Sequence, residues 1–177
     1  PIQVSDNEED IIVDSGRLSF RVSKNKFNLL EDLLVDGNKP LETAAIFTVR
    51  GEDGSTLSCN EEKPYSVAVE ESGPMHSVIA VHGWNTNEKS EHFLTYTVRI
   101  HAYRNQPFVR VFYTLTNRHE EQLTGKYKYA SGWPEDEKLY QFKEIPQRNI
   151  EDCTLWLKPK GMSEWTFGTN DETIKGN

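Results

Sequence analysis

Residues 92–116, HFLTYTVRIHAYRNQPFVRVFYTLT, decide the fold of this chain. On both sides of residues 104–107, apolar and polar side chains alternate, which is the period of a β-strand with one buried face. The four residues Arg-Asn-Gln-Pro between the two alternating runs suit a tight turn. A hairpin with Ala102 opposite Val109 places apolar side chains on one face of both strands. The stretch therefore predicts an antiparallel hairpin in a well-specified register, because a one-residue slip would move its apolar side chains into water.

The segment before this hairpin predicts a third antiparallel strand. Residues 77–83, SVIAVHG, place apolar side chains on the same face if Gly83 pairs with His92. In that register Ile79 lies opposite Tyr96, and the three strands form a meander over residues 77–116. Its apolar face would consist of Ile79, Val81, Leu94, Tyr96, Val98, Ile100, Val109, Val111, Tyr113 and Leu115.

The rest of the chain alternates short strand-like segments with turns, which is typical of all-β proteins. Expected strands cover 18–22, 27–35, 44–50, 66–71, 139–144, 150–158 and 164–167, although the leucines of 27–35 also fit a short helix. Residues 117–137 predict a long loop in a decorated C-terminal third. We expect an antiparallel β-barrel or sandwich in residues 15–167, after a lead-in strand or tail in 1–14 and before a tail in 168–177.

The composition limits the class of partner. The chain has 177 residues, which fits one domain or a tightly joined pair, and its aromatic content of 11% is typical of a folded protein. A net charge of −8 argues against nucleic acid and anionic membranes as partners. No apolar run approaches the roughly 18 residues that a transmembrane helix needs. Cys59 and Cys153 could form a disulfide or remain two separate thiols, and the spacing does not decide between these.

The sequence contains no recognisable catalytic or metal-binding motif. There is no GxSxG, HExxH, CxxC or phosphate-binding glycine loop, and we assign no catalytic residue, no metal and no cofactor. His76 and His82 would share one face of a strand, but at about 3.3 Å per residue they lie about 20 Å apart and cannot hold one ion. His119-Glu120-Glu121 has no evident partner and is interpreted as a solvated run.

The polar face of the meander carries the candidate binding residues. Arg99, His101 and Arg110 share this face in an otherwise acidic chain, with His101 facing Arg110. Guanidinium groups bind carboxylates in a bidentate geometry, so this face suits an acidic sugar. An ordinary solvated or inter-domain face is the alternative. Trp84 and Trp133 lie beside turn residues and are the more exposable tryptophans, which would suit stacking on a sugar ring, with packing as the alternative for each. Trp156 lies within an alternating strand and is interpreted as a packing residue.

Three stretches resemble a known family. These are SGRLSFRVSKNKFNLLEDLLVDGN, VAVEESGPMHSVIAVHGWNTN and LTYTVRIHAYRNQPFVRVFYTLTN, within residues 15–117. They resemble the N-terminal β domain of bacterial exo-rhamnogalacturonan lyase-like proteins, with a G-x-L-x-F-x-V strand, a G-P turn and a P-x-V-R-V strand. His76 stands where that family typically has another basic residue. The resemblance implies a RIFT-related barrel or sandwich within a much larger, secreted or periplasmic carbohydrate-active enzyme.

The resemblance implies an accessory, non-catalytic domain that packs against other domains of its parent chain and helps to form a glycan cleft. The parent would be a polysaccharide lyase, and no catalytic residue is transferred to this chain. Two alternatives stay open, namely a stand-alone binding module for acidic polysaccharides and a purely structural or interaction domain. An exposed aromatic side chain beside the arginine face would favour glycan binding, and a large apolar patch would favour a domain interface.

Overall fold

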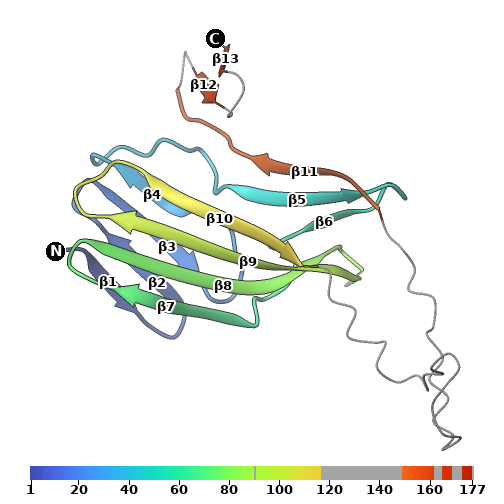
Figure 1. Cartoon of the computed structure of the whole chain (residues 1–177), viewed down its shortest axis with the longest axis horizontal. Helices are drawn as coiled ribbons and strands as arrows, with labels where there is room; N and C mark the ends of the chain where they lie inside the picture. The colour runs from blue at the N-terminus through green and yellow to red at the C-terminus, as the bar shows by residue number, and fades with distance from the viewer. Residues whose placement is uncertain (90, 117–148, 162–164, 169–172, 177) are drawn as a thin grey trace, which may run out of the picture.

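The computed structural model describes residues 1–89, 91–116, 149–161, 165–168 and 173–176, and these residues contain thirteen strands and no helix (Figure 1). The described segments therefore include no helix that could cross a lipid bilayer. The strands are β1 Gln3–Asp6, β2 Asp10–Asp14, β3 Leu18–Ser23, β4 Glu31–Val35, β5 Ile46–Gly51, β6 Thr56–Ser58, β7 Ser66–Ser72, β8 His76–Thr86, β9 His92–Tyr103, β10 Val109–Thr116, β11 Ile150–Trp156, β12 Trp165–Gly168 and β13 Thr173–Gly176. The expectation of an all-β antiparallel fold is confirmed.

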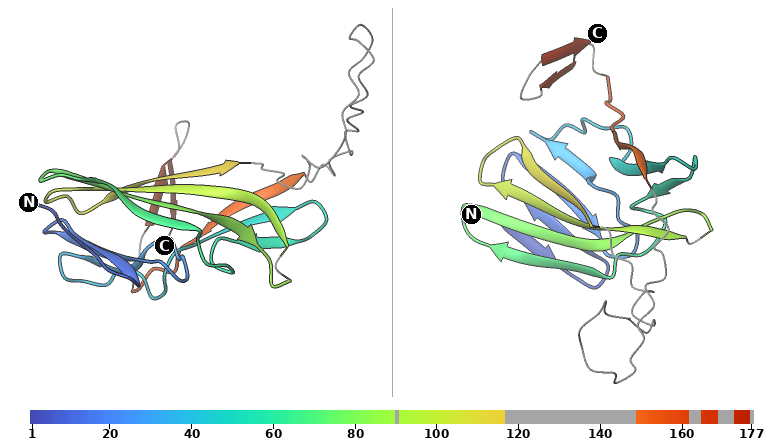
Figure 2. Two further views of the ribbon diagram at one scale, coloured as in Figure 1. Left: turned by 90° about the horizontal axis from the view of Figure 1, so that it is seen from below. Right: turned by 45° about the vertical axis from the view of Figure 1, so that its right-hand side comes forward.

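Two sheets pack face to face, as the left view of Figure 2 shows. The smaller sheet has the order β1-β2-β3-β4, and the larger has the order β10-β9-β8-β6-β5-β11, with β7 also paired to β8. The core between them is formed by alternate residues from both sheets, because successive side chains of a strand point to opposite faces. Its largest fully buried members are Tyr96, Phe20, Phe27, Ile11, Ile79 and Ile100. β12 and β13 pair with each other as a separate two-stranded sheet.

The larger sheet curls into a half-barrel. In a flat sheet β5 and β10, four places apart, would be separated by about 19 Å at about 4.8 Å per strand. The ring centroids of Phe47 on β5 and Tyr113 on β10 are instead 3.9 Å apart. The sheet must therefore bend, and the Tyr113 hydroxyl also donates a hydrogen bond to Asn85 Oδ1 on β8 (3.2 Å). The residues of the larger sheet also form a second, smaller buried cluster of Val49, Leu57 and Leu94, with Phe47 and Leu115 packed against it.

The meander forms as expected, with one correction to its register. The β9–β10 register is confirmed, since Val109 pairs with Ala102 and Leu115 pairs with Tyr96. The β8–β9 register is wrong by four residues, because Ile79 lies opposite Ile100. β8 continues to Thr86, three residues beyond the expected end, so the connection to β9 is shorter than we assumed. A shift of four keeps every side chain on its expected face, since the strand period is two.

Tyr96 and Gly83 form the centre of the core. Gly83 pairs with Tyr96 across β8 and β9, and the phenol ring lies over the glycine. Tyr96 is fully buried, its hydroxyl donates to the Cys59 carbonyl oxygen (3.2 Å), and its ring stacks on Phe27. Burial raises the pKa of the Tyr96 phenol far above its ordinary value. A side chain at position 83 would occupy the space of this ring.

The N-terminal third departs from expectation in detail. Residues 1–14 form β1 and β2, and Ile11 and Val13 are fully buried in the core. Asp36-Gly37 forms the expected turn, with positive φ at both residues. The strand expected over 27–35 is shorter, because only Glu31–Val35 pairs as β4, and the short-helix alternative is wrong. The residues just before β4 instead insert into the core as an irregular segment.

Both cysteines are free thiols. Cys59 is buried, with its sulfur 3.8 Å from the Phe27 carbonyl oxygen, and burial raises the pKa of its thiol. Cys153 is exposed on β11. The disulfide alternative is therefore not realised. The expected loop at 117–137, with Trp133 and His119, and the expected strand at 139–144 lie outside the described residues.

Candidate functional site

The candidate site lies on the outer face, by which we mean the face of β7–β10 that points away from the β1–β4 sheet. A register shift in β7 between Val69 and Glu71 sets two carboxylates opposite Val78 of β8. Such a bulge adds one residue to a strand and re-aims the neighbouring side chains. Glu70 and Glu71 consequently both bind residues of the outer face, although strict alternation would point only one of them there.

Arg99 is held by Glu70. Its Nε donates to Glu70 Oε2 (2.7 Å) and one of its terminal nitrogens donates to Oε1 (2.8 Å), a bidentate pair that reaches across β8. This hydrogen bonding, with the arginine charge, lowers the pKa of Glu70 below its ordinary value. Arg99 is therefore already committed to a carboxylate of its own chain and is a positioning element on this face.

A chain of hydrogen bonds runs from Glu71 through two histidines. His76 Nδ1 lies 2.9 Å from Glu71 Oε1, and His76 Nε2 lies 3.0 Å from His101 Nδ1. One nitrogen of the histidine pair must lack a proton to accept this bond, so the two rings are not both cationic while it persists. The pKa of His101 is lowered, first by burial and then by the charges of His76 and Arg110. The His76 ring also stacks on Tyr103 (4.8 Å).

Arg110 is the exposed cation of the outer face. It pairs with His101 across β9 and β10, and no carboxylate of the described residues lies within ion-pair distance of it. Phe112, two residues along β10, packs edge-on against His101 (5.2 Å) and remains 50% exposed. Phe108 is also 50% exposed and its ring lies 5.8 Å from that of Tyr103. A guanidinium without a carboxylate partner in the described part of the chain therefore lies beside solvent-facing aromatic rings.

Of the five residues expected to bind ligand, the structure brings three together. Arg99, His101 and Arg110 are neighbours on the outer face, as expected from the β9–β10 register. Trp84 lies farther along β8, within the strand and half-buried, with its ring 5.0 Å from that of His92. It is therefore not the exposed loop residue that the turn residues around it suggested. Trp133 lies outside the described residues.

Sequence reasoning missed the acidic partners and one exposed tryptophan. The doublet Glu70-Glu71 interrupts the alternation of VAVEES, and such an interruption is the signal of a bulge.

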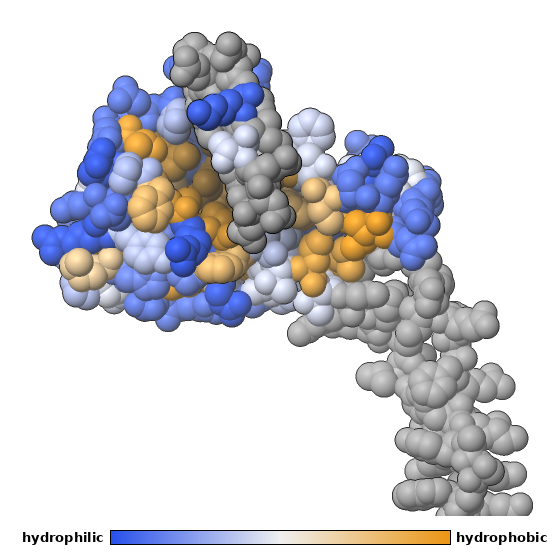
Figure 3. All heavy atoms as spheres, turned by 45° about the horizontal axis from the view of Figure 1, so that its top comes forward, coloured by the Kyte–Doolittle hydropathy of each residue, from blue (hydrophilic) through white to orange (hydrophobic). Residues whose placement is uncertain are grey.

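Trp156 was expected to pack, but it is 60% exposed, because β11 is the edge strand of the larger sheet. Figure 3 shows apolar residues at the surface on its right-hand side, where β5, β6 and β11 lie in Figure 1. In β11 and the residue after it, Ile150, Leu155 and Leu157 are exposed as well.

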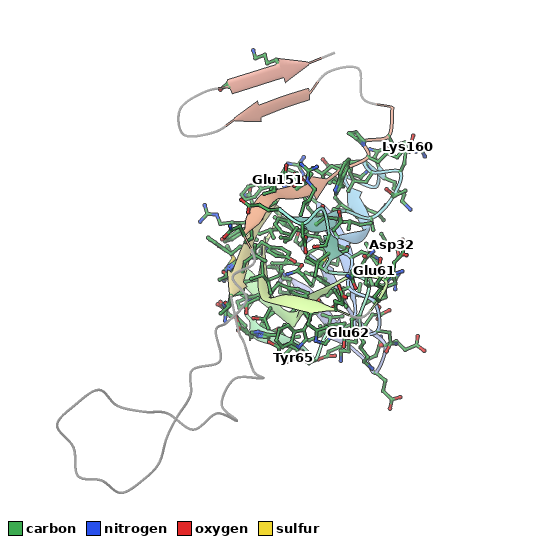
Figure 4. The ribbon with its side chains drawn as sticks, turned by 90° about the vertical axis from the view of Figure 1, so that its right-hand side faces the viewer. Asp32, Glu61, Glu62, Tyr65, Glu151 and Lys160 are labelled. Atoms are coloured by element: carbon green, nitrogen blue, oxygen red, sulfur yellow. The ribbon has the colours of Figure 1, made fainter. Side chains whose placement is uncertain are left out.

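A groove of about 810 Å³ lies at this end of the larger sheet. It is lined by β5, the β5–β6 turn, β6, the β8–β9 connection and Trp156 of β11. The indole Nε1 of Trp156 donates to Thr48 Oγ1 (2.9 Å), which holds the ring against the sheet. Figure 4 views the molecule from this end and labels Glu61 and Glu62, which follow β6 in the chain. Within the described ranges no three His, Cys, Asp or Glu side chains converge as a metal site.

Comparison with known families gives one match. The family model described as "PcRGLX-like protein central beta sandwich domain" matches residues 2–125, which include every strand from β1 to β10. A comparison with curated proteins found no match. The expected family is confirmed, with a correction to the domain within it, because the match is to the central sandwich and not to the N-terminal barrel. The chain therefore belongs to the PcRGLX-like central β-sandwich family and carries a β domain of rhamnogalacturonan lyase-like proteins.

Proposed function

We propose that this chain is a non-catalytic accessory domain of a secreted or periplasmic rhamnogalacturonan lyase-like protein, whose outer face contacts the acidic glycan. The observation that carries the proposal is Arg110, a cation without a carboxylate partner among the described residues, beside the exposed ring of Phe112. A polymeric substrate does not cross a membrane, and a domain that contacts it belongs outside the cytoplasm.

The local charge supports an acidic ligand. The whole chain has a net charge of −8, yet this part of the outer face and its hairpin hold three arginines, Arg99, Arg104 and Arg110, against the two carboxylates of Glu70 and Glu71. With neutral histidines the local balance is 3 − 2 = +1. A positive patch on an acidic protein favours an anion at that place and disfavours it elsewhere.

The outer face would bind and orient the glycan. Arg110 can form two parallel hydrogen bonds to a uronate carboxylate, and this geometry fixes the sugar as well as attracting it. The rings of Phe108 and Phe112 offer flat apolar surfaces for the C–H side of the neighbouring pyranose. β-Elimination needs a base for the proton next to the carboxylate and a group that stabilises the developing charge. We place those groups in another domain of the parent chain.

The test is a calorimetric titration of the chain with rhamnogalacturonan oligosaccharides and with tetragalacturonate. Loss of a charged hydrogen-bonding partner costs about 1.5–3 kcal/mol, so Arg110→Gln should weaken binding at least about tenfold. Arg17→Gln is the matched control, since Arg17 forms an exposed ion pair with Asp36 on the smaller sheet. Equal affinity for the wild type and Arg110→Gln would refute the assigned contact.

The same mixtures test the absence of catalysis. β-Elimination creates an unsaturated uronate that absorbs ultraviolet light, so a rise in absorbance would overturn the accessory assignment. We expect the absorbance to stay constant with the isolated chain and to rise only with the complete parent protein.

A second role for the same face is docking of a neighbouring domain of the parent. Met75 is 60% exposed and lies against Arg104, which donates to its sulfur (3.8 Å), while Phe108 and Phe112 are exposed on either side of Arg110 in the sequence. Hydrogen exchange in the complete parent would discriminate the two roles. Protection of the edge strand β10 that exceeds its protection in the isolated chain, without ligand, indicates a domain interface. Additional protection that appears only with oligosaccharide indicates a glycan contact.

A further inference from the structure

The groove at β5, β6 and β11 has a chemistry opposite to that of the outer-face arginines. Four carboxylates line it, Asp53, Glu61, Glu88 and Glu91, against the single ammonium of Lys89. Its volume of about 810 Å³ is within the usual range for small-molecule sites, about 300–1,000 Å³. An acidic sugar would meet a local balance of 1 − 4 = −3 there, so the groove disfavours the ligand that Arg110 favours.

Trp156 gives the groove a fixed aromatic wall. Its indole N–H is already used by Thr48 Oγ1, and its ring remains 60% exposed, so the ring surface and not the N–H is free for a ligand. Holding an aromatic ring in one orientation before binding reduces the entropy that binding must overcome.

Hydrogen-bonding groups surround this aromatic wall. Glu61 lines the groove with no hydrogen-bond or ion-pair partner among the described residues, so its carboxylate can accept from two neighbouring hydroxyls. The walls also contain the hydroxyls of Thr48, Ser55 and Ser58. Asn60 is held in place, because it accepts from Ser58 (2.7 Å) and donates to Asn28 (2.9 Å). The groove thus offers a flat apolar wall and a set of donors and acceptors.

We propose that this groove binds an uncharged oligosaccharide, with a pyranose ring stacked on Trp156 and its hydroxyls donating to Glu61. A basic peptide is the competing ligand, since carboxylates and an indole also attract cations. The uncharged sugar is favoured because Trp156 is the one aromatic side chain among the described lining residues, whereas recognition of a cation typically uses several rings. Lys89 in the lining further disfavours a cation. The proposal is independent of the glycan contact at Arg110.

The test uses the indole N–H signals of the uniformly ¹⁵N-labelled chain. The signal of Trp156 is assigned with Trp156→Phe, and the chain is titrated with galactotetraose, arabinotetraose and xylotetraose. Tetragalacturonate and trilysine serve as the anionic and cationic probes. We expect at least one neutral tetrasaccharide to shift the Trp156 signal saturably, and neither charged probe to shift it comparably.

Variants separate this groove from the outer face. Trp156→Ala and Glu61→Gln should each weaken neutral-saccharide binding at least about fivefold, while Arg110→Gln should leave it unchanged. Because both changed side chains are exposed, the backbone spectrum should stay that of the wild type, which verifies folding. The proposal is overturned if no neutral probe shifts the Trp156 signal up to about 10 mM, a range that covers weak millimolar affinity. It is also overturned if trilysine binds in preference, or if both groove variants bind the sugar as the wild type does.

Discussion

Replacement of Gly83 by alanine tests the central packing of this sandwich. A Cβ at this position would lie only 2.8 Å from Cε1 of the Tyr96 ring and closer still to its Cζ and Oη. The ring has little freedom to move away, since it is fully buried, stacks on Phe27 with centroids 5.6 Å apart and is anchored at Cys59 by its hydroxyl. Overpacking a core typically lowers the free energy of unfolding by about 1–3 kcal/mol. Because the Tyr96 ring cannot easily move, we expect Gly83→Ala to cost about 3 kcal/mol.

Equilibrium unfolding in urea measures this loss. We expect the midpoint to fall while the slope is preserved, which is the signature of a lower stability without a change in the surface exposed on unfolding. Gly37→Ala is the matched control. Gly37 has φ +76° and no atom within 4 Å of an added Cβ, so only its backbone strain contributes, about 1 kcal/mol.

A double-mutant cycle with Tyr96→Phe isolates the contact. The single change removes the hydrogen bond to the Cys59 carbonyl and should cost about 1 kcal/mol. Because it also removes the Oη atom that an alanine at 83 would meet, the two losses should not add, and the coupling should be about 1 kcal/mol or more. Strict additivity, or a loss below about 0.5 kcal/mol for Gly83→Ala, would refute the reasoning.

Three further predictions concern charges and thiols. Glu70→Gln should lower stability by no more than about 1 kcal/mol, because its ion pair with Arg99 is well exposed, and urea unfolding should show the difference shrink at high salt. The pKa of His101 is lowered in the folded chain, so as the pH falls the unfolded chain binds a proton at this histidine before the folded chain does. The contribution of His101 to stability is therefore present above a pH of about 6.5 and is lost as the pH falls. In melting experiments His101→Gln should reduce the dependence of stability on pH. A thiol reagent should modify Cys153 in the native protein and Cys59 only after denaturation, and two reactive thiols in the native state would contradict the buried position of Cys59.

Much of the fold could be predicted from local pattern. The alternation around residues 104–107 specified both strands of the β9–β10 hairpin, and its register placed Arg99, His101 and Arg110 on one face. The register of β8 against β9 could not be derived in the same way. The length of the connection depends on where β8 ends, and the side chain of Asn87, which accepts bonds from the backbone of Lys89 and Glu91, closes that connection.

The sequence by itself determined the strands, their buried faces and the shared face of the arginines, because a period of two is a local property of the chain. Tertiary structure decided which of these side chains are exposed and unpaired enough to contact a ligand. Glu70 pairs with Arg99 across β8, β11 lies at the edge of the larger sheet with Trp156 exposed, and Trp84 is half-buried within a strand. Those outcomes depend on residues far apart in the chain meeting in space, and no local pattern contains that information.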